Sequence, residues 1–225
     1  MKLASTILLL TWVMLASTCG PGSCTPSWLA EARERDDRTA ASRHNHGSKP
    51  RCNEPLLQWF KRTFNSSSGA DILDVGGGRG AMGAQIRAVL PLPSVVRYDC
   101  VDVVASDTCA LYPGDAIPDE RDGSRAVVLF NYVLHHAGDG STISLLQEAR
   151  RVSRRWVVVV EDLRGETLEE AELNFAHEWG GVFRGPREWA QLFRLVGLAL
   201  RETIPIPRDC GFRDLARAVF VLEVR

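Results

Sequence analysis

The sequence lacks the patterns of a cysteine-stabilised scaffold and of a nucleic-acid binder. Its six cysteines are scattered and form no C-x-x-C pair, which argues against a disulfide scaffold and against a zinc or redox site of that kind. Lys and Arg number 27 against 28 Asp and Glu, and the body of the chain has no long basic run. Because the sequence indicates no basic surface that could neutralise the phosphates of a nucleic acid, we expect a small-molecule partner and no nucleic acid.

Internal repeats are also absent, and the length of 225 residues suits one substantial domain better than two. With 45% hydrophobic and 24% charged residues, the composition is that of an ordinary globular protein. The chain is therefore long enough to bury a core of its own, and a two-domain enzyme is disfavoured.

One long uncharged run lies near the N-terminus, where Lys2 precedes residues 3–16 and small residues follow as far as Gly20. This pattern predicts a secretory signal peptide over residues 1–20. The run is shorter than the ~20 apolar residues that cross a bilayer, so we expect membrane contact only through an uncleaved signal segment. The predicted destination is the secretory pathway, either endomembrane or secreted, with a plastid reached through a bipartite leader as the alternative.

Residues 31–54 contain no aliphatic side chain larger than Ala. Such a segment cannot bury enough apolar surface to offset the entropy lost on ordering. We therefore expect a disordered linker or second targeting segment over residues 21–52, followed by one ordered domain over residues 53–225. Cys24 and Cys52 lie near the ends of this segment and are candidates for a disulfide.

The ordered part alternates between apolar strand patterns and amphipathic helix patterns. This alternation predicts an α/β fold with a doubly wound, mostly parallel sheet and helices on both faces. A first helix with apolar residues between 56 and 64 is expected to cover an edge of the sheet. We predict strands at 71–75, 95–104, 126–133, 156–161, 199–206 and 216–224, and helices at 82–90, 142–152 and 186–196.

A glycine-rich loop follows the first predicted strand and is the most informative part of the sequence. Glycine is needed where the backbone turns tightly and approaches a ligand, and four glycines exceed what a plain turn requires. Residues 78–83 also match the dinucleotide pattern G-x-G-x-x-G, with Asp102 placed beyond it for a ribose hydroxyl. However, in a dinucleotide site this loop would bind a negatively charged pyrophosphate, and the nearby Asp74 carboxylate carries the same sign of charge. A carboxylate there suits a ligand that carries an amino group.

The pattern Asp74-x-Gly76-x-Gly78-x-Gly80 resembles motif I of the class I methyltransferases that use S-adenosylmethionine. The resemblance extends over residues 55–225. It implies a Rossmann-like sheet of seven strands whose last strand is antiparallel, and it implies S-adenosyl-L-methionine as the cofactor.

The same resemblance assigns roles to further residues. It implies that Asp102 holds both ribose hydroxyls, with Asp99 as the alternative, because one carboxylate can accept two hydrogen bonds. It also implies that Asp115 and Ala116 contact the adenine, and that Asn131 lies at the cofactor site.

The stretch from residue 127 to His136 resembles the small-molecule branch that includes ubiquinone and menaquinone biosynthesis. We predict methyl transfer to a small-molecule acceptor, in which positioning of the two reactants does most of the work. His135 and His136 are the candidate catalytic residues, needed as a base for an acidic hydroxyl. No metal is predicted. Two alternatives stay open, an NAD(P)-dependent oxidoreductase and a catalytically silent cofactor-binding protein of the same fold.

Overall fold

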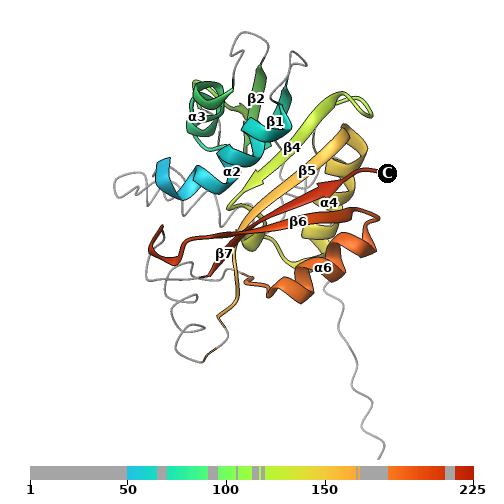
Figure 1. The fold of residues 1–225 in the computed structure, drawn as a ribbon. Helices are drawn as coiled ribbons and strands as arrows, with labels where there is room; N and C mark the ends of the chain where they lie inside the picture. Colours follow the sequence, from blue (N-terminus) through green and yellow to red (C-terminus); the bar gives the residue numbers. More distant parts are fainter. Residues whose placement is uncertain are drawn as a thin grey trace, which may run out of the picture.

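The computed structural model describes residues 50–64, 70–90, 96–104, 106–112, 117, 120–165, 167, 182–210 and 216–225. These residues form a seven-stranded sheet with helices on both faces (Figure 1). The strands are β1 Asp71–Val75, β2 Arg97–Asp102, β3 Ala110–Leu111, β4 Arg125–Asn131, β5 Ser153–Asp162, β6 Ala199–Ile206 and β7 Arg217–Glu223. The helices are α2 Pro50–Thr63, α3 Ala81–Val89, α4 Asp139–Val152 and α6 Pro186–Leu195, with short 3-10 turns η3 Leu134–His136 and η4 Arg208–Cys210.

The strand order is β3-β2-β1-β4-β5-β7-β6. The pairs β1–β2, β1–β4, β2–β3 and β4–β5 are parallel, whereas β7 runs antiparallel between β5 and β6. The structure thus confirms the predicted α/β class, with a mostly parallel sheet and an antiparallel last strand. The two-residue strand β3 was not predicted, because a segment that short has no detectable periodicity.

Two hydrophobic clusters, one on each face of the sheet, make up the core. In β5, Val158 and Val160 pack with α2 and α3 on one face, whereas Val157 and Val159 pack with α4 and α6 on the other. All four valines are at most 1% exposed. Because both faces are covered, the strand is apolar at consecutive positions, as a central parallel strand should be.

Helix α2 lies across one face of the sheet and also reaches the edge strand β6, where Arg62 pairs with Glu202, in line with the expectation that it covers an edge. Its Trp59 and Phe60 are buried and belong to the cluster that contains residues of β1, β4 and β5. Trp59 also meets Trp156 of β5 edge to face, with ring centroids 6.0 Å apart. The aromatic side chains are large enough to reach the central strands, and burying each one contributes roughly 2–3 kcal/mol.

The cysteines also differ from the prediction. Cys100 of β2 and Cys109 form a disulfide, a pairing that their spacing did not suggest. The Cys52 thiol donates to the Cys210 carbonyl oxygen at 2.6 Å. Cys24 lies outside the described residues, as do the predicted signal segment at 1–20 and residues 21–49.

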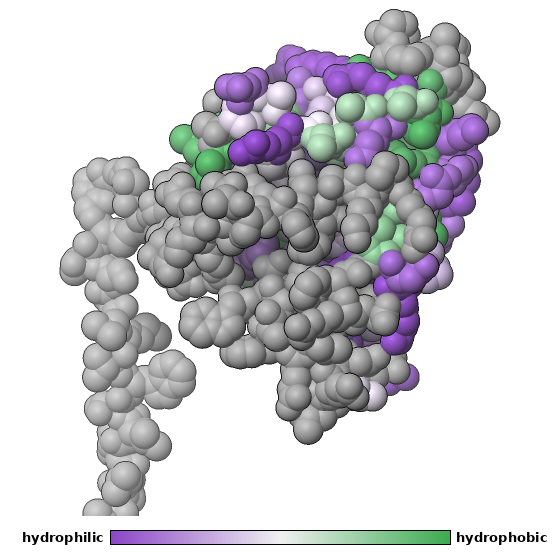
Figure 2. Space-filling view, turned by 90° about the vertical axis from the view of Figure 1, so that its left-hand side faces the viewer, coloured by the Kyte–Doolittle hydropathy of each residue, from purple (hydrophilic) through white to green (hydrophobic). Residues whose placement is uncertain are grey.

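The described surface carries few large exposed apolar side chains. Among the described residues, the exposed ones are Leu111 of β3, Val182 just before α6, Leu195 of α6 and Leu200 of β6. Figure 2 shows hydrophilic and hydrophobic residues interspersed over the coloured part of one side. Among the described residues, no helix combines the length and the apolar character needed to cross a bilayer.

Candidate functional site

The candidate site lies where the parallel strands β2, β1, β4 and β5 end. β1 pairs with β2 on one side and with β4 on the other, so the chain leaves the ends of β1 and β4 in opposite directions across the sheet. In open α/β sheets, such a switch point is where ligands bind. Each side chain predicted for the site and described by the structure lies in one of these strands or directly after it.

The glycine loop after β1 is a tight turn that leads into α3. The amide groups of Gly76 and Gly77 donate to the Val101 carbonyl oxygen at 2.8 and 3.2 Å. Gly76 has φ +77°, and a Cβ added there would lie 2.3 Å from Cγ2 of Val133. Only glycine fits, and the loop therefore packs directly on the segment that follows β4.

Asp102, the predicted ribose ligand, ends β2 and faces this loop. Its Oδ2 accepts from the Gly78 amide at 2.8 Å, and its Oδ1 accepts from the Val104 amide at 3.0 Å. Each carboxylate oxygen has two lone pairs and can accept more than one hydrogen bond. The side chain is thereby held in place at the lip of the loop.

Asp99, the alternative to Asp102, has a different environment. Its Oδ2 lies 2.5 Å from the Arg125 guanidinium and 2.9 Å from that of Arg97. Burial opposes ionisation, but the hydrogen bond and charge of Arg125, helped by Arg97, hold the pKa of Asp99 below its usual value. Asp99 is therefore committed to ion pairs, and the geometry favours Asp102 as the ribose ligand.

The segment after Asp102 is fastened to the loop at further points. The Ser106 hydroxyl donates to the Gly78 carbonyl oxygen at 3.3 Å, and the Thr108 hydroxyl donates to that of Arg79 at 2.8 Å. The Cys100–Cys109 disulfide closes this segment onto β2. Two sides of the site are thus joined by side-chain hydrogen bonds and by a covalent bond.

Asp74, near the end of β1, is only 1% exposed. The Tyr98 hydroxyl donates to its Oδ2, whereas its Oδ1 has no hydrogen-bond partner among the described residues. Burial raises the pKa of Asp74 to about 7; the Tyr98 hydrogen bond opposes this rise and the negative charge of Asp102 adds to it. A buried carboxylate with an unmatched acceptor atom fits a cationic donor such as an ammonium group.

His135 lies in η3 and is 2% exposed. Its Nδ1 lies 2.6 Å from Oε2 of Glu161, and the Glu161 Oε1 accepts from the amides of Val133 and Leu134 at 3.0 and 2.6 Å. Burial raises the pKa of Glu161 to about 7, opposed by the Leu134 amide and by the charge of His136. The imidazole of His135 is therefore held through its Nδ1 by the buried carboxylate of Glu161.

Aromatic rings surround this pair. The Phe183 ring stacks on His135 with centroids 5.6 Å apart, and the His136 centroid lies 4.1 Å from that of His135. Both histidines were predicted from the sequence, whereas Glu161 was not. A carboxylate that ends a continuous apolar strand was the available signal.

The end of β4 adds a second buried acceptor. Oδ1 of Asn131 is buried and has no hydrogen-bond partner among the described residues. The next residue, Tyr132, has φ +59°, which side-chain-bearing residues rarely adopt. Arg217 and Asp162 form a buried ion pair next to Tyr132, and the Arg217 guanidinium lies 5.5 Å from the Tyr132 ring centroid. Asp115 and Ala116, predicted to contact adenine, lie outside the described residues.

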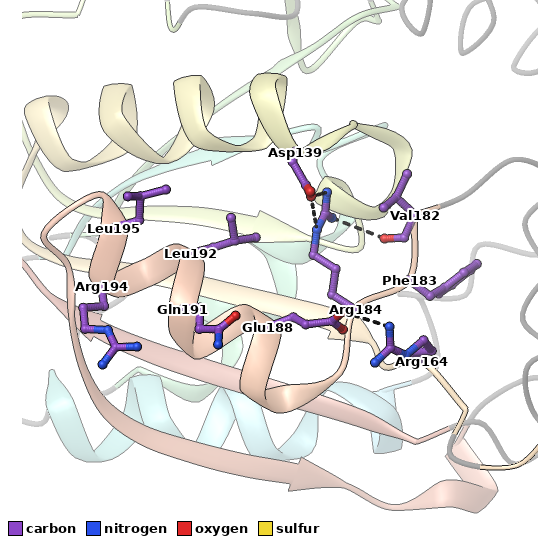
Figure 3. Close-up of a pocket in the computed structure, with 10 residues that line it drawn as sticks. All are labelled: Asp139, Arg164, Val182, Phe183, Arg184, Glu188, Gln191, Leu192, Arg194 and Leu195. Atoms are coloured by element: carbon purple, nitrogen blue, oxygen red, sulfur yellow. Dashed lines mark hydrogen bonds and ion pairs between the residues drawn. The ribbon is translucent and has the colours of Figure 1, made fainter. Parts of the chain in front are cut away.

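A cavity of about 740 Å³ lies between α4 and α6 (Figure 3). Arg184 lies at its centre and binds Asp139 at 2.8 Å and the carbonyl oxygens of Leu134 and Ala137 at 3.3 and 3.0 Å. Phe183 points away from the other lining side chains in Figure 3. None of the predicted site residues lines this cavity, but it borders the site, because the lining residue Phe183 stacks on His135. In the part of the chain that the structure describes, no cluster of three His, Cys, Asp or Glu side chains could hold a metal ion.

Comparison with known sequences adds independent information. A family model described as an O-methyltransferase domain matches residues 26–199. Cephaeline 6'-O-methyltransferase from Carapichea ipecacuanha is 24% identical over 224 residues, which cover 92% of this chain and 61% of that relative. Mitomycin biosynthesis 6-O-methyltransferase from Streptomyces lavendulae is 26% identical over 182 residues, covering 72% and 49%. The chain thus spans about half to three fifths of the length of these relatives.

Solved structures show the same fold. The Burkholderia thailandensis 1,6-didemethyltoxoflavin-N1-methyltransferase, solved with its substrate and S-adenosylhomocysteine, matches with a TM-score of 0.68 and 14% identity over 92% of each chain. The mitomycin 7-O-methyltransferase matches with a TM-score of 0.56 and 21% identity over 86% of this chain and 58% of the other. The Rossmann-like class I methyltransferase fold is therefore confirmed, whereas the predicted ubiquinone and menaquinone branch is not.

Proposed function

Because this chain belongs to the O-methyltransferase family, we propose that it transfers the methyl group of S-adenosylmethionine to a hydroxyl oxygen of a small molecule. The observation that carries this proposal is the buried His135–Glu161 pair, which lies where the neighbouring strands β4 and β5 end, with His135 after β4 and Glu161 near the end of β5. An oxygen acceptor must lose a proton on methylation, and a positioned imidazole is the usual group to remove it.

The residues at the end of β1 and β2 fit the proposed cofactor. Oδ1 of Asp74 would accept a hydrogen bond from its ammonium group, and the Asp102 carboxylate would hold its ribose hydroxyls. When bound, S-adenosylmethionine supplies a methyl group on a positively charged sulfur, so the carbon is already electrophilic. The protein's remaining tasks are to orient the acceptor and to take up its proton.

Glu161 determines which nitrogen of His135 would take up the proton of the acceptor. Because Nδ1 is held at 2.6 Å from the carboxylate, Nε2 is the nitrogen that would receive the hydroxyl proton. The imidazolium that forms is stabilised by the negative charge of Glu161. Two backbone amides hold that carboxylate in position, so the orientation of the ring does not depend on bound substrate.

Binding is the first test. We expect the full chain to bind S-adenosylmethionine saturably in a calorimetric titration and the D102A variant to bind it at least tenfold more weakly, because the loss of one hydrogen bond to a charged group costs ~1.5–3 kcal/mol. NADH is titrated alongside. A well-folded chain that binds NADH and not S-adenosylmethionine would refute the proposal and favour the oxidoreductase.

Activity is the second test. With a panel of phenolic alcohols as acceptors and methylated products detected by mass spectrometry, we expect H135Q to lose roughly 10²- to 10⁴-fold in rate and to retain cofactor binding. H136Q is the comparison variant, because Nδ1 of His135 lies 2.6 Å from the Glu161 carboxylate, whereas the neighbouring His136 acts on Glu161 through its charge. Equal rates in H135Q and the unmodified chain would contradict the role of His135.

A further inference from the structure

Tyr98 connects Asp74 to the rest of the site. It lies in β2, paired with Ile72 of β1, and its hydroxyl donates to Oδ2 of Asp74 across the two strands. The bond leaves Oδ1 as the oxygen without a partner among the described residues. The phenol therefore engages one oxygen of the carboxylate and not the other.

The fold makes room for this ring at Gly83 of α3. A Cβ added at Gly83 would lie 2.6 Å from Cδ1 of Tyr98, so any side chain there would displace the ring. On the next turn of the helix, the Arg87 guanidinium lies 5.7 Å from the ring centroid. The helix thus approaches the sheet closely enough to confine Tyr98 between a glycine and a cation.

We propose that Tyr98 is a positioning residue, which orients the Asp74 carboxylate so that Oδ1 is presented to the ammonium group of S-adenosylmethionine. This inference rests on the proposed function and deepens it. Tyr98 acts through Asp74 and has no role in the chemical step.

The hydrogen bond also affects the charge of Asp74. Burial favours the neutral acid, whereas a donor to the carboxylate favours the anion, and an ammonium group needs the anion. The groups that act on Asp74 are Tyr98 and Asp102, both from β2, while Arg87 from α3 acts from behind the Tyr98 ring. Without the Tyr98 hydroxyl, the pKa of Asp74 would rise further above about 7.

Cofactor affinity measured against pH tests this inference. We compare the dissociation constant of S-adenosylmethionine between pH 5.5 and 9 for the full chain, Y98F and the control Y112F, which removes a buried tyrosine hydroxyl from the hydrophobic cluster on the opposite face of the sheet. For the unmodified chain, affinity should fall as pH drops through the Asp74 pKa. For Y98F, we expect roughly tenfold weaker binding at pH 7 and a midpoint shifted upward by about one pH unit. Y112F should keep the midpoint of the unmodified chain.

A second variant, D74N, tests the inference independently of whether Y98F folds. D74N cannot ionise, so its binding should be weak and should lack this midpoint. A D74N profile with the original midpoint would overturn the inference, as would Y98F binding that is unchanged or uniformly weakened without a shift. Failure of the unmodified chain to bind S-adenosylmethionine would overturn the proposed function as well, which distinguishes the two failures.

Discussion

Replacement of Asp74 by Asn should stabilise the protein while it weakens cofactor binding. The side chain is 1% exposed, and burial raises its pKa to about 7 from an ordinary value near 3.8. A difference of about three pH units corresponds to ~4 kcal/mol at ~1.4 kcal/mol per unit. Asn has almost the same shape, can still accept from the Tyr98 hydroxyl and carries no charge, so it should avoid most of this cost.

The sign follows from proton linkage. The folded state binds the Asp74 proton more tightly than the unfolded state does, because its pKa is raised on folding. The stabilising contribution of this group is complete below about pH 4, decreases as pH rises and is lost above about pH 7. The advantage of D74N should therefore be small at pH 4, grow between pH 4 and 7, and reach at most ~4 kcal/mol at pH 8.

Urea unfolding followed by tryptophan fluorescence at pH 4.5, 6, 7 and 8 measures this difference. Burial raises the pKa of Glu161 to about 7 as well, but Glu161 is present in both proteins, so its contribution cancels. If D74N were no more stable than the unmodified chain at pH 8, the argument that the buried carboxylate costs stability would be refuted.

Two other interactions give predictions for stability. R217A removes the partner of the buried Asp162 and should lower the free energy of unfolding by ~3–5 kcal/mol. R201A, at an exposed ion pair, should lower it by less than ~1 kcal/mol in the same urea assay. Similar values for the two variants would contradict the role of burial. The disulfide between Cys100 and Cys109 closes a short loop, so C100S/C109S should lose ~3 kcal/mol. The double variant should also bind S-adenosylmethionine more weakly, because the disulfide holds the segment after β2; unchanged affinity in calorimetry would contradict that link.

Much of the fold could be predicted because its signals are local. The bounds predicted for β1 and β6 match the structure, since glycine or loop residues end each strand abruptly. Asp102 could be assigned to the ribose from its position after the glycine pattern and from the family resemblance. The structure explains why this holds, because the adjacent parallel strands β1 and β2 bring their carboxyl ends to the same edge of the sheet.

The contacts that make the site work were not predictable in this way. Glu161 meets His135 only because β4 and β5 pair with Asn131 opposite Val160. A shift of one residue in that register would turn Glu161 to the opposite face of the sheet. Tyr98 depends in the same way on the register of β1 and β2, and β2, in which only Cys100 is buried, has no hydrophobic pattern that would fix this register from the sequence.

Buried ionisable groups at the strand ends distinguish a site from a core. Arg217 and Asp162 compensate each other, so their burial has a structural explanation. Among the described residues, Asp74 has no cationic partner, and the groups that can bring a positive charge to Glu161 are the imidazoles of His135 and His136. An apolar or amide side chain at either position would fold with less loss of solvation energy. A chain that had kept only the fold has no physical reason to retain these two carboxylates, whereas one that binds an ammonium group and orients an imidazole requires both.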